Sequence, residues 1–336
     1  MPDIPLILVA VVAIGLLFDF TNGAHDSANA IATIVSTKVL SPLTAVCMAG
    51  ALNLLGAFLG TAVAHTIGSG IVRPELVADS QGLVLAALLG AIVWNLFTWY
   101  LGLPSSSSHA LVGGLIGAAI AYGGFDAPSY GSIVHKVLLP LVLSPLAGFV
   151  SGYFLMVLLS WLVRRATPHR VNVLFRKLQI VSSAFMATSH GLNDAQKTMG
   201  IITLALFIFG EIPEMTVPFW VKLSCALAMG LGTATGGWKI VKTMGHKIFK
   251  LEPIHGFAAE TAAAAVISGA SALGAPISTT HIISTTVIGV GASKRLSAVR
   301  WGIAGRLVVA WVMTIPAAAL VAAVCYWLLA VTGIAK

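Results

Sequence analysis

Long apolar segments separated by short polar loops make up most of this chain. Runs that carry very little charge span roughly 4–20, 42–67, 83–103, 136–163, 199–209, 217–235, 258–275 and 301–331. Several runs reach the ~20 residues that a helix needs to cross a bilayer, while others are too short to cross alone. The pattern predicts an all-α, polytopic membrane protein.

Polar clusters interrupt these segments, and they do so twice in the same order. The stretch Gly23–Asn29 (GAHDSAN) returns as Gly191–Lys197 (GLNDAQK), and Pro104–His109 (PSSSSH) returns as Pro276–His281 (PISTTH). A duplicated half that carries interrupted apolar segments is typical of a secondary transporter whose substrate lies between the repeats. The two pairs of motifs therefore predict an internal duplication with a function at its centre.

Composition supports a membrane protein and excludes other classes. Hydrophobic residues make up 58% of the 336 positions and charged residues only 9%, far below the roughly 25% of soluble proteins. The net charge of +8 comes from short loops between apolar runs, so it indicates orientation rather than nucleic-acid binding. Cys47, Cys225 and Cys325 are scattered in apolar segments, which argues against a disulfide framework or a thiolate metal site.

Basic residues predict which loops face the cytoplasm. They gather in three loops, at Arg164, Arg165, Arg170, Arg176 and Lys177, at Lys239, Lys242, Lys247 and Lys250, and at Lys294, Arg295 and Arg300. The segment 258–291 then begins and ends on the cytoplasmic side and is interrupted at 274–276, which predicts a re-entrant hairpin. Its counterpart at 83–122 is flanked by few basic residues (Arg73, His135, Lys136) and is expected to enter from outside.

The two halves are therefore expected to be inverted. The predicted units are a first repeat at 1–163, a cytoplasmic link at 164–178 and a second repeat at 179–336. Each repeat would hold a broken helix, a re-entrant helical hairpin and three crossings, at about 4–38, 42–67 and 136–163, and at 179–210, 217–235 and 301–331. Both termini come out external. An ordinary bundle of about eight to ten helices is the alternative.

The first cluster places acids at membrane depth. Asp26 and Asn29 would share a face of a helix that starts after Gly23. A buried carboxylate costs about 2.5–3.5 kcal/mol on the gentlest scales, so it needs a cation, a proton or a partner. Asn22 and Asp26 would also serve as N-caps, but capping does not explain Asp194 at the matching place. Glu260, in the first arm of the second hairpin, is a further cation or proton candidate.

The hairpin tips have the chemistry of an anion site. A proline followed by hydroxyl residues opens a helix whose first N–H groups lack partners, and such helix starts bind anions. The tip hydroxyls are Ser105, Ser106, Ser107, Ser108, Ser278, Thr279 and Thr280. Isolated hydroxyls would only bond to the preceding turn, whereas two such tips would surround a tetrahedral oxyanion. His109 and His281 follow directly, either as structural residues or as proton or substrate ligands.

These four motifs and the basic link resemble the PiT family of inorganic phosphate transporters over nearly the whole chain. The resemblance implies an inverted-repeat protein, often dimeric, that carries phosphate inward with sodium ions or protons. By motif match, the cation-site residues would be Asp26, Asn29, Asn193 and Asp194, which would bind sodium in a sodium-coupled member, and the tip hydroxyls would hold phosphate. The expected partners are inorganic phosphate, a coupling cation, the lipid bilayer and a second copy in a homodimer, with no tightly bound cofactor.

Two departures from the family pattern concern the coupling ion. His25 stands where the family usually has Asn, and Lys197 stands where an Asn would match Asn29. We hypothesise that the Lys197 ammonium takes the place of a sodium ion, which favours proton or metal-phosphate cotransport. Asn53 also stands where animal members carry an acid. The candidates for cation or proton coupling are Asn22, Asp26, Asn29, Asn193, Asp194, Lys197 and Glu260.

Competing functions are weaker on chemical grounds. A sulfate permease of the same fold is the nearest, but phosphate keeps a proton that it can donate to Asp26 or Asp194, whereas sulfate only accepts. Ser107, His109 and Asp26 supply the residue types of a hydrolytic triad, yet an enzyme would not need the duplication. An anion channel is a remote alternative. We therefore expect a non-enzymatic phosphate importer that works by alternating access in a bacterial cytoplasmic (inner) membrane.

Overall fold

The computed structural model describes residues 5–68 and 81–333, and within these ranges every regular element is a helix. This confirms the all-α prediction. Arg73, one of the few basic residues beside the first hairpin, lies outside the described residues.

Helices follow the same order in the two halves. The first half holds α1 (Leu6–Ser36), α2 (Pro42–Gly56), α3 (Ala62–Gly68), α5 (Gln81–Leu101), α6 (Ser107–Gly123), α7 (Tyr130–Ile133) and, after a π-helical turn at Val134–Leu138, α8 (Leu139–Leu162). The second half holds α9 (Pro168–Ile208), α10 (Phe219–Thr235), α11 (Trp238–Lys242), α12 (Pro253–Ala272), α13 (Thr279–Lys294) and α14 (Trp301–Val331). By position, α1 corresponds to α9, α5 and α6 to α12 and α13, and α8 to α14.

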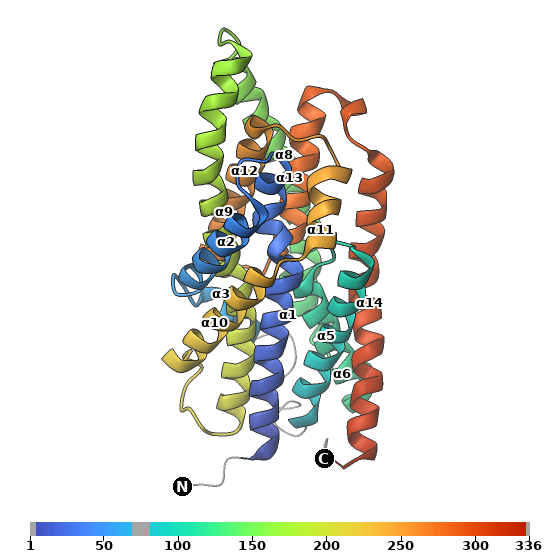
Figure 1. Cartoon of the computed structure of the whole chain (residues 1–336). Coiled ribbons are helices and arrows are strands. Elements are labelled where there is room, and N and C mark those ends of the chain that lie inside the picture. The colour runs from blue at the N-terminus through green and yellow to red at the C-terminus, as the bar shows by residue number, and fades with distance from the viewer. Residues whose placement is uncertain (1–4, 69–80, 334–336) are drawn as a thin grey trace.

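The halves interlock by reciprocal packing. Helix α6 packs on α14 and α13 packs on α8, so each second hairpin helix lies against the last helix of the other half. Likewise α1 packs on α10 and α2 on α9. In Figure 1, α1 and α9 lie side by side and run in opposite directions, and the start of α1 and the end of α14 lie at the same end of the molecule. The orientation of the halves in a membrane stays a prediction.

Four of the described helices have segments long and apolar enough to cross a membrane. They are Leu6–Ser36, Gly82–Leu101, Val142–Leu162 and Trp301–Val331, and α2 and α10 are shorter apolar helices. Large side chains such as Trp161 and Leu320 are exposed on the last helix of each half, as a lipid-facing surface requires. Helix α9 is longer than any of these, at 41 residues, but a buried stripe of polar side chains runs along it.

The helix start predicted after Gly23 is wrong, because α1 runs through this glycine without a break, as α9 does through the matching Gly191. Each glycine lies where two helices cross. A Cβ atom at Gly23 would clash with the carbonyl oxygen of Met229, and one at Gly191 would clash with that of Asn53. These glycines allow close backbone approach rather than a helix start.

The breaks lie elsewhere. The apolar run 42–67 divides into α2 and α3 around 57–61, whereas its counterpart 217–235 forms the single helix α10, which ends before Gly236, a residue with a φ of 75°. The loop between the halves is also shorter than the expected link at 164–178. Helix α9 already starts at Pro168, because Thr167 has extended backbone and proline fits the first helical position.

The two helical hairpins lie where the sequence predicts them, at α5–α6 and α12–α13. Each turn passes through a glycine with positive φ, Gly102 at 67° and Gly274 at 69°. The second helix of each then starts on a serine cap. Ser106 Oγ accepts the His109 N–H at 3.3 Å, and Ser278 Oγ accepts the His281 N–H at 3.2 Å. The caps hold the hydroxyls that follow them in matching positions.

Candidate functional site

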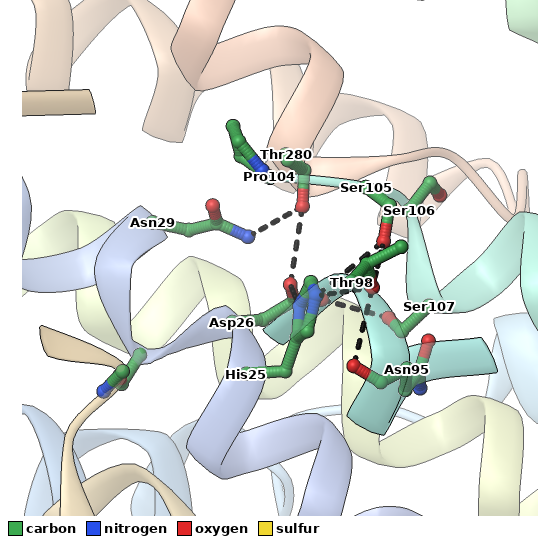
Figure 2. Close-up of polar contacts among 12 residues, drawn as sticks. His25, Asp26, Asn29, Asn95, Thr98, Pro104, Ser105, Ser106, Ser107 and Thr280 are labelled. Carbon is green, nitrogen blue, oxygen red and sulfur yellow. Dashed lines mark hydrogen bonds and ion pairs between the residues drawn. The ribbon is translucent and has the colours of Figure 1, made fainter. Parts of the chain in front are cut away.

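Both hairpin tips converge on the middle of α1 and α9. Figure 2 shows the first tip and Thr280 of the second tip around His25, Asp26 and Asn29 of α1. Every candidate site side chain predicted from the sequence is buried. The structure therefore brings the four motifs together in one enclosed polar cluster.

Asp26 receives hydrogen bonds from both halves of the chain. His25 Nδ1 donates to its Oδ1 at 2.7 Å, and Ser107 Oγ, from the tip of the same half, donates to its Oδ2 at 2.7 Å. Thr280 Oγ1, from the tip of the other half, donates to Oδ1 at 3.3 Å. Asp26 thus lies between the two hairpins.

Asp194 has a matching set of contacts but one of its donors is a fixed cation. Thr279 Oγ1, from the tip of its own half, donates to Oδ2 at 2.7 Å. His190 Nε2 lies 2.9 Å from the same oxygen, and Lys197 Nζ forms an ion pair with Oδ1. Asp194 is therefore charge-compensated within its own helix.

The residue three positions after each Asp reaches the tip of the opposite half. Asn29 Nδ2 donates to Thr280 Oγ1 at 2.9 Å and to Thr279 Oγ1 at 3.2 Å. Lys197 Nζ donates to Ser108 Oγ and, at 2.9 Å, to the carbonyl oxygen of Ile277. Each Asp thus bonds to its own tip, and its i+3 neighbour bonds to the other tip.

Lys197 is surrounded by oxygens of the kind that bind hard cations. Its ammonium contacts a carboxylate, a hydroxyl and a backbone carbonyl, contributed by Asp194, Ser108 and Ile277. At the matching place in the first half stands the neutral Asn29, whose buried Oδ1 has no hydrogen-bond partner. The two halves share geometry and differ in charge.

Other predicted residues contribute less directly. Asn193 donates from Nδ2 to Ser271 Oγ at 2.8 Å, and both amide atoms of Asn22 are buried without a hydrogen-bond partner. Ser105 Oγ donates to Thr98 Oγ1 at 2.8 Å, whereas Ser106 and Ser278 act as helix caps. Ser105 Oγ also lies 3.4 Å from His25 Nε2, and the tip hydroxyls that bond to the motif acids or to Lys197 are Ser107, Ser108, Thr279 and Thr280.

Glu260 is held in a separate buried network. Thr33 Oγ1 donates to its Oε1 at 2.5 Å, Gln179 Nε2 donates to the same oxygen at 3.0 Å, and Ser182 Oγ donates to Oε2. Because Thr33 follows Asn29 by one turn of α1, this network lies next to the central cluster without direct contact to Asp26.

The two tip histidines pack on each other. Their ring centroids lie 4.8 Å apart, and the His281 ring stacks on Trp311 at 4.1 Å. Trp311 Nε1 donates to the Pro104 carbonyl at 3.0 Å. Ser107 donates to Asp26 directly, so the His109 imidazole does not stand between them as a hydrolytic triad requires.

The sequence reasoning missed His190 and Asp19. His190 corresponds to Asn22 in the repeat, and its Nδ1 donates to Asn53 Oδ1 at 2.8 Å while Nε2 faces Asp194. Asp19 is a fully buried acid seven residues before Asp26. The helical spacing of both from the motif aspartates was the signal that would have found them.

Two halves with the same helix order, each sending a hairpin tip to a buried acid in the interior, define a helical membrane transporter of the repeat type. Comparisons with known proteins identify the family. The chain matches the profile of the Phosphate transporter family over residues 22–322, and it belongs to this family.

Relatives with similar sequences match this chain along nearly its full length. A protein of Rhizobium meliloti is 52% identical over 96% of both chains, and one of Bacillus subtilis is 47% identical over 97% of this chain and 98% of its own. Both are described as probable low-affinity inorganic phosphate transporters. A solved structure, "The sodium-dependent phosphate transporter", superposes with a TM-score of 0.83 at 25% identity, covering 97% of this chain and all of the other. The family resemblance read from the motifs is confirmed, and these relatives are transporters rather than enzymes.

Proposed function

We propose that this protein imports inorganic phosphate together with a cation, by alternating access, across a bacterial cytoplasmic membrane. The observation that carries the proposal is the matched pairing of the tips with the acids, Ser107 with Asp26 and Thr279 with Asp194, each at 2.7 Å. Membership of the Phosphate transporter family and the names of the relatives support phosphate as the substrate.

Phosphate would dock on the hydroxyls that now bond to the carboxylates. Ser107 and Ser108 are the first two residues of α6, and Thr279 and Thr280 are the first two of α13. Both pairs therefore lie at the positive end of a helix dipole. The Lys197 ammonium adds a positive charge beside Ser108. When a cation neutralises an acid, its hydroxyl partner is released to donate to the phosphate oxygens.

Charge balance would couple the two substrates. With bare carboxylates the site repels an anion, so phosphate binds well only after Asp26 is neutralised. Asp194 already has the ammonium of Lys197 as its counter-ion. We therefore propose a proton as the coupling ion, with metal phosphate as a further form of the substrate.

One sodium ion would also fit the first half. The unpartnered Oδ1 of Asn29, the Asp26 carboxylate and the Thr280 hydroxyl are hard oxygen donors close together. The second half does not fit a sodium ion in the same way, because the Lys197 ammonium bonds to Asp194 and the Asn193 amide bonds to Ser271. This supports fewer sodium ions than two matched sites would hold.

Alternating access would follow from rocking of the interlocked halves around the buried site. The predicted inverted topology places both chain ends outside and the basic loops in the cytoplasm. Homodimer formation stays a prediction from the family resemblance.

Purified protein in liposomes tests the proposal. Labelled phosphate uptake is measured under an inward proton gradient, an inward sodium gradient, or neither, with protein-free liposomes as the control. We expect accumulation under the proton gradient and not under sodium alone. Uptake that needs only sodium would contradict proton coupling, and block by excess sulfate would favour the sulfate permease.

A further inference from the structure

A second buried acid lies on α1 outside the cluster at the tips. The Asp19 side chain is fully buried, and its Oδ1 accepts a hydrogen bond from Thr198 Oγ1 at 2.9 Å. Its Oδ2 is buried without an oxygen or nitrogen donor, and the Cys225 thiol lies beside the carboxyl group. Among the described residues, none of the ion pairs involves Asp19. The mechanism proposed above gives this carboxyl group no role.

The surroundings of Asp19 favour a proton over a metal ion. The titratable groups that act on it are Asp194 and Lys197 of α9 and the Cys225 thiol of α10. The Lys197 ammonium is already bonded to Asp194, Ser108 and Ile277. Hard metal cations need several oxygen ligands, whereas the side chains beside Asp19 offer one hydroxyl and a thiol. Burial away from water disfavours the charged form of a carboxyl group that has no ion-pair partner, so such a group readily takes up a proton.

Asp19 is also placed to sense the transport site. Seven residues, about 10.5 Å along a helix, separate it from Asp26, and Asn22 lies between them on the same face of α1. Its partner Thr198 directly follows Lys197 on α9 and is four residues after Asp194. A shift of α9 that moves the Lys197 ion pair would therefore also move the hydroxyl that holds Asp19.

Glu260 of α12 is a buried acid beyond the opposite end of the central cluster from Asp19. It bonds to Thr33, seven residues after Asp26, so two buried acids flank the central cluster at equal spacing along α1. Between them, Asn22, Asp26 and Asn29 continue the polar stripe of buried side chains. The buried polar stripe of α1 therefore reaches from Asp19 to Thr33, the residue that bonds to Glu260.

We propose that Asp19 is a proton-binding site of the transport cycle, distinct from Asp26 and Asp194. One proton binds the Asp19 carboxylate from one side of the membrane and leaves to the other side in the same cycle, and only an O–H bond forms and breaks. This inference rests on the proposed proton coupling. It predicts that neutral substitutions at Asp19 remove one proton per phosphate while leaving the phosphate site intact.

The test measures labelled phosphate and a pH-sensitive dye in the same liposomes, for the wild type, D19N, D19S and the exposed-acid control D126N. Phosphate exchange at equal pH, which needs no net proton movement, reports an intact phosphate site. For a gradient of one pH unit, the loss of one coupled proton should lower steady accumulation about tenfold. We expect D19N and D19S to show this loss and a lower proton-to-phosphate ratio, with exchange within about twofold of wild type, and D126N to match the wild type.

A wild-type ratio in D19N or D19S would overturn the proposal and leave Asp19 a structural residue. Two neutral variants of different size are used so that one that does not fold leaves the other to decide. A changed ratio of labelled sodium to phosphate, with the proton ratio unchanged, would also overturn it. If the wild type itself shows no uptake under a proton gradient, the proposed function fails, and that result is separate from any effect at Asp19.

Discussion

The two halves of the central site have the same geometry and different charges. In the first half, Asp26 bonds to Ser107, and Asn29 reaches across to Thr280. In the second half, Asp194 bonds to Thr279, and Lys197 takes the place of Asn29 and reaches across to Ser108. The duplication therefore accounts for the shared arrangement, and the exchange of amide for ammonium at Asn29 and Lys197 changes its fixed charge, while His25 and His190 stand where the other half has Asn193 and Asn22.

The tips differ far less than the helix motifs. Ser107 and Thr279 carry the same hydroxyl group, and so do Ser108 and Thr280. An anion between the tips would thus meet nearly equal hydroxyl donors from the two halves. A cation would find only Asp26 without a lysine as counter-ion, because Asp194 already pairs with Lys197.

The largest effect is expected from removal of either acid. D26N and D194N should each abolish gradient-driven phosphate uptake, a loss of at least about 100-fold, because neither the charge nor the proton site remains. D194N should also lower thermal stability, since a buried ion pair that loses one partner costs about 3–5 kcal/mol. Uptake assays and thermal unfolding in detergent measure both. Full, gradient-driven uptake by both variants would contradict the assignment.

Exchange of Lys197 should make the halves alike. K197N removes the fixed ammonium and recreates in the second half the Asp-x-x-Asn pattern of Asp26 and Asn29. We expect phosphate uptake that becomes sodium-stimulated by about tenfold, measured at constant ionic strength with potassium or choline as the control cation. If phosphate uptake by K197N does not change with sodium, Lys197 does not occupy the place of a bound sodium ion.

The tips should respond equally to loss of a hydroxyl. S107A and T279V each remove one donor to a carboxylate and to the proposed phosphate site, so KM should rise about tenfold in both, as expected for a bond to a charged group. S106A, which removes only a helix cap, should instead cost about 1 kcal/mol of stability with little change in KM. A rise in KM in only one of S107A and T279V would contradict an anion site shared equally by the two tips.

The smallest effect is expected from H25N, which restores the match to Asn193. An amide Nδ2 can replace the Nδ1–H that His25 donates to Asp26. We therefore expect less than about threefold change in uptake and the same coupling ion, measured under separate proton and sodium gradients. A change of coupling ion in this variant would show that His25, rather than Lys197, determines which cation is coupled.

Most of the architecture and the residue types of the site could be predicted from the sequence. The hairpin at 258–291 followed from basic loops on both sides of an apolar run that is interrupted at 274–276, and the one at 83–122 followed as its counterpart. The helix start after Gly23 was wrong because glycine can either interrupt a helix or let two helices approach closely, and the sequence pattern is the same for both. Asp19 was missed although it lies seven residues before Asp26, because the sequence around it does not show which side chains surround it in the fold.

The sequence by itself determined that the chain is an all-helical membrane protein of the Phosphate transporter family with two repeated pairs of polar motifs, because apolar length and repeated motifs are local properties. Only the tertiary structure decided which groups meet. Asn29 bonds to a threonine 251 positions away, and Lys197 bonds to a serine of the opposite half. Such pairs depend on where helices cross, and crossing points are set by close packing between distant segments rather than by any pattern along the chain.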